Sequence, residues 1–340
     1  MTHFYKSVTQ DIRKEGKNMK LSIFDIFIYR PLGFLIQMIY NLVENYGLAI
    51  ILFTIVVKLV LMPLQVKSQR AMRRQQKIQP IIMDLQKKYA NDQQRLSQEM
   101  MKVYRENNVS MTGGCLPLLI QFPILIGLYR VIQRPLTYIR GVNFADSAVV
   151  ENVKLITSQL KDKIGNVSVE TIEKTRQIDL SKWAEDMGVA DKLGWDINFN
   201  FLGLDLSKAP KASLNSWFTG DFSDWSIALL ILIPALAMLL TWLSSKYSQH
   251  LNGTAAKKTN SRSNQDNPAQ SMSKTMNMIM PIMTGFFTFT LPSGIGIYWI
   301  ISSVMQIVQQ FIITKYFDRK EDDFVVKVSE KNRKGSKKRR

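Results

Sequence analysis

The feature that most constrains the fold is a series of apolar segments separated by charged loops. Five candidate membrane spans are expected, at residues 46–66, 113–135, 225–245, 275–291 and 292–314. Each contains an apolar stretch of about 16–20 residues, close to the minimum for a helix that crosses a hydrocarbon layer roughly 30 Å thick. The sequence therefore predicts an all-α integral membrane protein with five transmembrane helices.

The residues before the first span lack a comparable apolar run. Residues 24–45 are aromatic and aliphatic, but Asp25, Arg30-Pro31 and Gln37 interrupt them. We expect an amphipathic helix that lies in the outer membrane interface. Residues 1–23 form a polar arm. Because Met19 begins a sequence typical of a translation start, residues 1–18 are interpreted as an upstream extension or a disordered arm, with neither a cleaved signal nor a lipid anchor.

The charges of the loops predict the orientation of the spans. Residues 67–106 hold ten Lys or Arg against four acidic residues, residues 246–274 five against one, and residues 315–340 eleven against five. Residues 136–224 instead hold ten basic and thirteen acidic residues. Basic loops stay in the cytosol. We therefore expect the N-terminus and the loop 136–224 outside, and the loops 67–112 and 246–274 and the tail 315–340 in the cytoplasm.

The first basic loop has a helical pattern of apolar residues. Two apolar stripes flank a break at Asn91-Asp92. Their members are Ile78, Ile81, Ile82, Leu85 and Tyr89, then Leu96, Met100, Val103 and Tyr104. This spacing predicts a helical hairpin. Its basic faces suit anionic lipid headgroups, ribosomal RNA or nascent chains, although an ordinary solvated surface would look the same, and no DNA partner is expected.

The acidic loop 136–224 has a weak apolar pattern. Amphipathic fragments occur at residues 149–160 and 169–183. Residues 196–206 alternate for a short distance, which permits a short strand or an interfacial contact. No catalytic arrangement is present in this loop.

Lys58 is the only charged residue in its apolar run. An ammonium group near the centre of a bilayer costs about 2.5–3.5 kcal/mol on insertion scales, so such residues usually face a protein interior or a wet cavity. A lysine that snorkels to an interface is the alternative. Several apolar residues separate Lys58 from either end of the run, which favours a functional charge.

Uncharged polar residues accompany Lys58 in the spans. Thr54 lies one turn before it, Gln121 lies in the second span, and residues 299, 302, 303, 306 and 310 share one face of the fifth span. Such residues can simply join helices by hydrogen bonds. Together with a buried charge, they favour a hydrophilic groove around which the five spans pack. The predicted groove residues are Lys58, Thr54, Gln121, Ser302, Ser303 and Gln306.

Several classes of chemistry lack their components. The only histidines are His3 and His250, the only cysteine is Cys115, and no Asp or Glu occurs within the five spans. Nucleotide-binding loops and hydrolase motifs are also absent from the sequence. We therefore expect no enzyme activity, no cofactor and no metal site.

The motifs of the spans resemble those of the YidC/Oxa/Alb family of membrane protein insertases. They are Asn45-Tyr-Gly-Leu-Ala-Ile50, Lys58-Leu-Val-Leu-Met-Pro63-Leu64, Gln79-Pro80, Gly113-Gly-Cys-Leu-Pro-Leu-Leu-Ile-Gln-Phe-Pro123, Met280-Pro281, Leu291-Pro-Ser-Gly294 and Tyr298-Trp299. The resemblance covers about residues 28–317. It is closest in form to Gram-positive members, which lack a large periplasmic domain.

The resemblance implies a groove that is open to the cytosol and lipid and closed to the outside, through which nascent membrane proteins enter the bilayer without nucleotide hydrolysis. Lys58 stands where many members have arginine, and Trp299 matches a groove tryptophan. The resemblance also implies that the hairpin receives substrates and that the basic tail contacts the ribosome. The Sec translocon and signal recognition particle components are further candidate partners. An anion-selective transporter or channel and a non-translocating assembly scaffold remain alternatives.

Overall fold

The computed structural model describes residues 25–110, 116–211, 225–251 and 268–317. The predicted arm 1–23, most of the tail 315–340 and much of the loop 246–274 lie outside these residues. In the described part, the only strands are β1 (Asn200–Phe201) and β2 (Leu204–Asp205), and helices form nearly all of the rest. The prediction of an all-α fold is confirmed.

The chain divides into two compact units. The first contains residues 1–38 and 122–195, and the second contains residues 39–121 and 196–340. Helix α2 (Arg30–Val43) and helix α6 (Leu116–Gln133) each contribute residues to both units.

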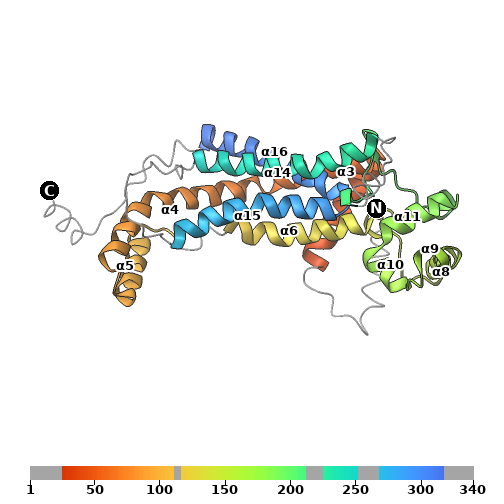
Figure 1. Ribbon diagram of the computed structural model, residues 1–340, viewed down its shortest axis with the longest axis horizontal. Helices are drawn as coiled ribbons and strands as arrows, with labels where there is room; N and C mark the ends of the chain where they lie inside the picture. The colour runs from red at the N-terminus through yellow and green to blue at the C-terminus, as the bar shows by residue number, and fades with distance from the viewer. Residues whose placement is uncertain (1–24, 111–115, 212–224, 252–267, 318–340) are drawn as a thin grey trace. The chain divides into compact units, whose positions relative to one another are not determined.

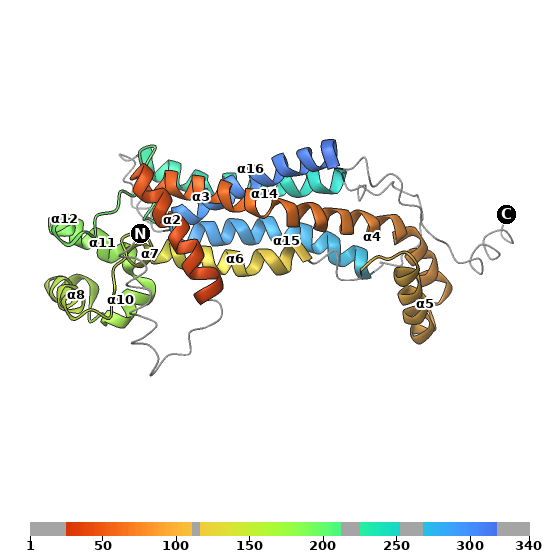
Figure 2. The same cartoon turned by 180° about the vertical axis from the view of Figure 1, so that it is seen from behind.

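The second unit is built around helix α16 (Ser293–Ile312), which ends in a π-helical turn, Ile313–Phe317. Helix α16 packs against α3 (Tyr46–Val60), α14 (Trp225–Leu251) and α15 (Pro268–Thr290). Helices α14 and α16 run alongside each other in Figures 1 and 2. Gly296 permits this close approach, because a Cβ atom at this position would lie 2.3 Å from Cγ2 of Ile233.

The predicted first span is broken rather than continuous. Helix α3 ends at Val60, and helix α4 (Met62–Lys88) leaves it at an angle of 57°. Pro63 lies in the first turn of α4. A proline there lacks the N–H that a continuous helix would need, and its ring clashes with the preceding turn. The span predicted at residues 46–66 therefore contains the end of α3 and the first turn of α4.

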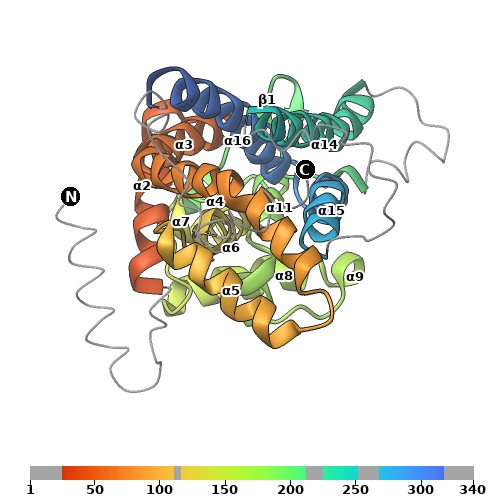
Figure 3. The ribbon, with the colours of Figure 1, turned by 90° about the vertical axis from the view of Figure 1, so that its left-hand side faces the viewer.

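The predicted helical hairpin is present. Helix α4 extends past the ends of α14 and α16 and is followed by α5 (Gln93–Glu106), which lies next to its C-terminal part (Figures 1 and 3). The carboxylate of Asp92 accepts a hydrogen bond from the N–H of Arg95 (2.9 Å) and so caps α5. The buried core of the hairpin contains Ile78, Ile82, Leu85, Leu96, Val103, Tyr104 and Val109.

The first unit is a set of short helices joined to α2 and α6. They are η2 (Asp25–Tyr29), α7 (Pro135–Tyr138), α8 (Ser147–Gln159), α9 (Lys161–Ile164), α10 (Val169–Thr175), α11 (Gln177–Asp186) and α12 (Ala190–Leu193). Although the apolar pattern of this region is weak, Val153, Ile156, Ile172 and Leu180 are fully buried. The buried side chain of Gln177 accepts from the N–H of Thr137 (2.9 Å) and donates to the Thr137 hydroxyl (2.7 Å), which ties α11 to α7.

Three helical segments are long and apolar enough to cross a membrane, and the bent pair α3–α4 could be a fourth. The three are residues 26–43, 229–248 and 293–315, and shorter apolar helices occur at residues 122–133 and 278–290. This comparison uses length and composition in the described residues only. Residues 26–43 qualify because η2 and α2 follow each other as one helical segment that contains a single charged residue, Arg30. The interfacial placement of residues 24–45 and the five-span topology therefore stay predictions.

The two strands form a small antiparallel hairpin whose turn contains a strained residue. Leu202 and Gly203 join the strands, and both have positive φ, 52° and 79°. Such turns favour asparagine or glycine at both central positions. Leu202 is also 82% exposed, so its side chain gains little from burial.

Replacing Leu202 by asparagine should stabilise the protein. Because a left-handed backbone costs most L-residues about 1–2 kcal/mol and asparagine less, we expect Leu202→Asn to raise the free energy of unfolding by about 1 kcal/mol. Thermal unfolding in detergent measures the change. Leu155→Asn is the matched control, since Leu155 is exposed within α8 and asparagine is a weaker helix former. A destabilised Leu202→Asn protein would show that the exposed leucine contributes a contact of its own.

Candidate functional site

Lys58 lies in the last turn of α3, immediately before the bend. Its side chain is half-buried, whereas the following residues Leu59 and Val60 are 53% and 72% exposed. The lysine therefore lies on a different face from these apolar side chains. A cation in the last turn of a helix is also favoured by the helix dipole.

The backbone of Lys58 is bonded directly to α16. Its carbonyl accepts a hydrogen bond of 2.7 Å from the side-chain amide of Gln309. In an unbroken helix this carbonyl would accept from the N–H of Met62. Because of the bend, the carbonyl of Lys58 is available to α16, and the buried side chain of Gln309 donates to it.

Gln309 was absent from the groove residues predicted from the sequence. The predicted polar face of the fifth span did not include Gln309; it consisted of residues 299, 302, 303, 306 and 310. A stripe with heptad spacing through Ser302, Gln306, Gln309 and Ile313 would have included it. Without knowledge of the bend, the sequence offered no reason to prefer that stripe.

Thr54 is fully buried one turn before Lys58. Its hydroxyl donates to the carbonyl of Ile50 within the same helix (2.6 Å). This local bond satisfies the hydroxyl inside the protein. Thr54 therefore shares the helix of Lys58 but donates its hydrogen bond within α3.

The predicted polar residues of α16 contact different neighbours. Ser302 and Ser303 are buried, and the Ser303 hydroxyl lies 3.2 Å from that of Thr241 on α14. Gln306 is half-buried. Trp299, also half-buried, stacks on Phe287 of α15 with ring centroids 6.4 Å apart. Gln121 belongs to α6, but its side chain lies outside the described residues.

Two further residues of the second unit, Ser68 and Gln310, contain buried polar atoms. The amide oxygen of Gln310 and the hydroxyl of Ser68 have no hydrogen-bond partner among the described residues. Buried polar atoms are nearly always paired, often with ordered water. We name Lys58, Ser302, Ser303, Gln306, Gln309 and Gln310 the polar cluster. Further along the chain, the guanidinium of Arg73 of α4 donates to the hydroxyl of Thr314 (3.0 Å). This bond joins α4 to the π-helical turn that follows α16.

The opposite ends of α3 and α16 are apolar. Three apolar side chains of α3 are fully buried, those of Tyr46, Ile50 and Phe53. On α16, the side chains of Ile295 and Tyr298 are also buried. A Cβ atom at Gly294 would lie 2.9 Å from the Tyr46 ring. The two helices are therefore closely packed and largely apolar near their first residues, whereas Lys58 of α3 and Gln309 of α16 meet near their last residues.

Comparison with known proteins identifies the family. A family model described as 60Kd inner membrane protein matches residues 38–321. The chain belongs to this family. A membrane protein insertase YidC of Clostridium perfringens is 30% identical over 275 residues, which cover 81% of each chain. The membrane protein insertase YidC of Clostridium tetani is 47% identical over 127 residues, which cover 37% of this chain and 56% of that protein.

Several relatives are much longer than the matched region. A membrane protein insertase YidC of Syntrophobacter fumaroxidans is 26% identical over 290 residues, and the match covers 85% of this chain but 38% of that protein. The family expected from the motifs is confirmed. Family and apolar helices together make this chain an integral protein of the bacterial inner membrane.

The contact between Gln309 and Lys58 should stabilise the packing of α3 on α16. Gln309→Leu keeps the approximate size of the side chain but leaves the Lys58 carbonyl without this donor. An unsatisfied buried acceptor costs about 1–3 kcal/mol, so we expect a loss of that order. Thermal unfolding in detergent measures it, with Val308→Ala on the exposed face of α16 as the control. Equal stability of Gln309→Leu and the native protein would show that the bond is dispensable.

Proposed function

We propose that this chain is a membrane protein insertase that moves nascent membrane proteins from the cytosol into the bilayer through a hydrated groove around Lys58, without nucleotide hydrolysis. Membership of the 60Kd inner membrane protein family supports the activity. The observation that carries the proposal is the division of α3 and α16 into an apolar end and a polar end that contains Lys58 and Gln309.

The helix lengths support a position for Lys58 beyond the middle of the bilayer. Lys58 follows Tyr46 by twelve residues, which is about 18 Å along a helix. Gln309 follows Ser293 by sixteen residues, or about 24 Å. With the first residues of both helices at one boundary of a hydrocarbon layer about 30 Å thick, Lys58 lies in the opposite half. By the charges of the loops, that half is the cytoplasmic leaflet.

The chemistry of insertion follows from this position. The ammonium group and the polar cluster hold water inside the leaflet, so the polar flank of a substrate crosses only part of the hydrocarbon. Acidic residues on that flank are attracted to Lys58 more strongly than in bulk water, because the effective dielectric constant is lower. The apolar part of the substrate then moves into lipid, where burial contributes about 25 cal/mol per Å².

We propose the partners and the orientation from the charges of the loops and the resemblance to the family. The N-terminus lies outside and the C-terminus in the cytoplasm. The basic faces of α4 and α5 bind substrates, anionic lipids and, together with the tail, the ribosome. The Sec translocon and signal recognition particle components are further partners. No enzyme activity, cofactor or metal is part of this mechanism.

Substitution of Lys58 tests the proposal directly. In liposomes that contain only this protein, we expect insertion of a short single-span substrate with the native chain and with Lys58→Arg, because both keep the charge. Lys58→Ala and Lys58→Glu should reduce insertion by about tenfold or more, as expected when an attraction of more than about 1.4 kcal/mol is lost or reversed. Protease protection of the translocated flank measures insertion. Normal insertion by Lys58→Ala would contradict the proposal.

A double variant separates the charge from its position. Lys58→Leu combined with Val60→Lys keeps one lysine in the last turn of α3 but moves it to the exposed face. We expect this protein to fold and to fail in insertion. Saturable anion flux without insertion would instead favour a transporter or channel. Full function of Lys58→Leu in assembly of other membrane proteins would favour a scaffold.

A further inference from the structure

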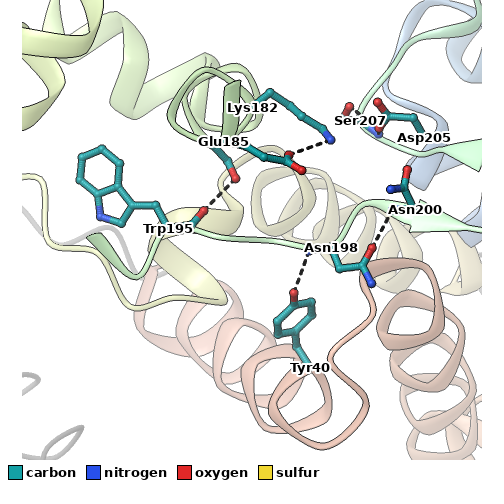
Figure 4. Close-up of polar contacts among 9 residues, drawn as sticks. Tyr40, Lys182, Glu185, Trp195, Asn198, Asn200, Asp205 and Ser207 are labelled. Atoms are coloured by element: carbon teal, nitrogen blue, oxygen red, sulfur yellow. Dashed lines mark hydrogen bonds and ion pairs between the residues drawn. The ribbon is translucent and has the colours of Figure 1, made fainter. Parts of the chain in front are cut away.

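The hairpin formed by residues 198–208, which we name the cap hairpin, bonds to the beginning of α3. The carbonyl of Asn198 accepts from the N–H of Tyr46 (3.0 Å), and the N–H of Asn198 donates to the hydroxyl of Tyr40 (3.0 Å). Asn45 donates its side-chain amide to the carbonyl of Asn200 (2.8 Å). Figure 4 shows Asn198 between Tyr40 of α2 and Asn200 of β1.

The other arm of the cap hairpin bonds to the beginning of α16. The carbonyl of Lys208 accepts from both the N–H (3.0 Å) and the hydroxyl (2.7 Å) of Ser293. The carbonyl of Leu206 accepts from the N–H of Gly294 (3.3 Å). The first N–H groups of a helix have no partner within the helix. The cap hairpin supplies acceptors to two such helix ends and thereby holds them together.

Apolar side chains of the cap hairpin also pack against the first turn of α3. Phe199 and Leu206 are buried, and the ring of Phe199 meets that of Tyr46 edge-on at 4.9 Å. A Cβ atom at Gly47 would lie 2.4 Å from Cγ of Phe201 and 2.8 Å from Cδ1 of Leu206. The backbone of α3 therefore touches the hairpin directly, and only glycine leaves enough space for this contact.

The hairpin is also stabilised internally. The side-chain oxygen of Asn198 accepts from the N–H of Asn200 (3.1 Å), and that of Asp205 accepts from the N–H of Ser207 (3.0 Å). The N–H of Leu206 donates to the carbonyl of Phe199 (3.1 Å). These bonds fix the conformation of both arms within the hairpin itself, in addition to its contacts with the helices.

We propose that the cap hairpin is the seal of the insertase groove: it closes the α3–α16 pair at the end opposite Lys58, so that water admitted at the polar cluster stops before it crosses the membrane. This inference rests on the proposed function, because a seal matters only if the polar cluster is hydrated. Gly47 is the position that lets the seal close. Asn45, Tyr40 and Ser293 are positioning residues that hold it in place.

Thiol labelling tests the seal. The chain has one cysteine, Cys115, and Cys115→Ser provides a cysteine-free background. Ala49→Cys then places a thiol at a fully buried position of α3, two residues after Gly47. With the native cap, a membrane-impermeant maleimide should react slowly with this thiol. Adding Gly47→Ala should displace Phe201 and speed the reaction about tenfold or more, because a buried group reacts only when its cover opens.

The same proteoliposomes report on the seal through ion leakage. A trapped pH-sensitive dye should show faster proton entry with Gly47→Ala than with the native chain. Gly285→Ala is the matched control, because the atom nearest to its Cβ atom would be the flexible sulfur of Met238, at 3.2 Å. Leu202→Cys, at the exposed tip of the hairpin, should be labelled at the same rate with either glycine variant.

A second variant keeps the test valid if Gly47→Ala does not fold. Asn45→Asp retains an oxygen that caps the N–H of Leu48 but loses the donor to Asn200 and places a carboxylate against its carbonyl. It should also increase labelling of Ala49→Cys. If both variants fold and the buried thiol stays as protected as in the native protein, the seal is disproved. If the native chain instead fails to insert a substrate while its buried thiol stays protected, the proposed function is wrong. The closure of the α3–α16 pair by the cap hairpin would still stand.

Discussion

The structure depends on how the backbone groups at the two ends of α3 find hydrogen-bond partners in distant parts of the chain. At its first residues, the N–H of Tyr46 donates to the carbonyl of Asn198 of the cap hairpin. At its last residues, the carbonyl of Lys58 accepts from Gln309 of α16. Each unsatisfied backbone group in hydrocarbon costs several kcal/mol. Both partners lie more than a hundred residues away, so these bonds join distant parts of the chain.

The bend at Leu61 connects this backbone requirement to the position of the charge. Because α3 stops at Val60, Lys58 lies at the end of a helix rather than in the middle of one. Its ammonium group is favoured by the helix dipole, and its carbonyl is available to α16. An exposed apolar face at Leu59 and Val60 lies beside a half-buried charge. The arrangement suits a protein that must offer water and lipid to the same substrate.

Helix α16 carries the division between the apolar and polar ends. Its first residues pack against Tyr46 and Ile50, while Ser303 approaches Thr241 and Gln309 reaches Lys58 further along. Small residues at Gly294 and Gly296 allow the close packing at the first end. At the second end, the buried amide oxygen of Gln310 has no hydrogen-bond partner within the described residues. One helix thus forms part of both the closed end and the polar end.

The sequence by itself determined the helical class, the hairpin of α4 and α5 and the family, because apolar periodicity, breaks such as Asn91-Asp92 and ordered motifs are local signals. For residues 196–206 it left a short strand and an interfacial contact both open, and the structure has the strands β1 and β2. It also singled out Lys58, since a charge in an apolar run is visible without any fold. Only the tertiary structure decided that the helix breaks before residue 66 and that Gln309 donates to the carbonyl of Lys58. It also decided that the Thr54 hydroxyl bonds within α3, and that residues 198–208 bond to the first residues of α3 and α16. These outcomes depend on which distant segments supply hydrogen-bond partners to helix ends, and that choice is made when the helices pack.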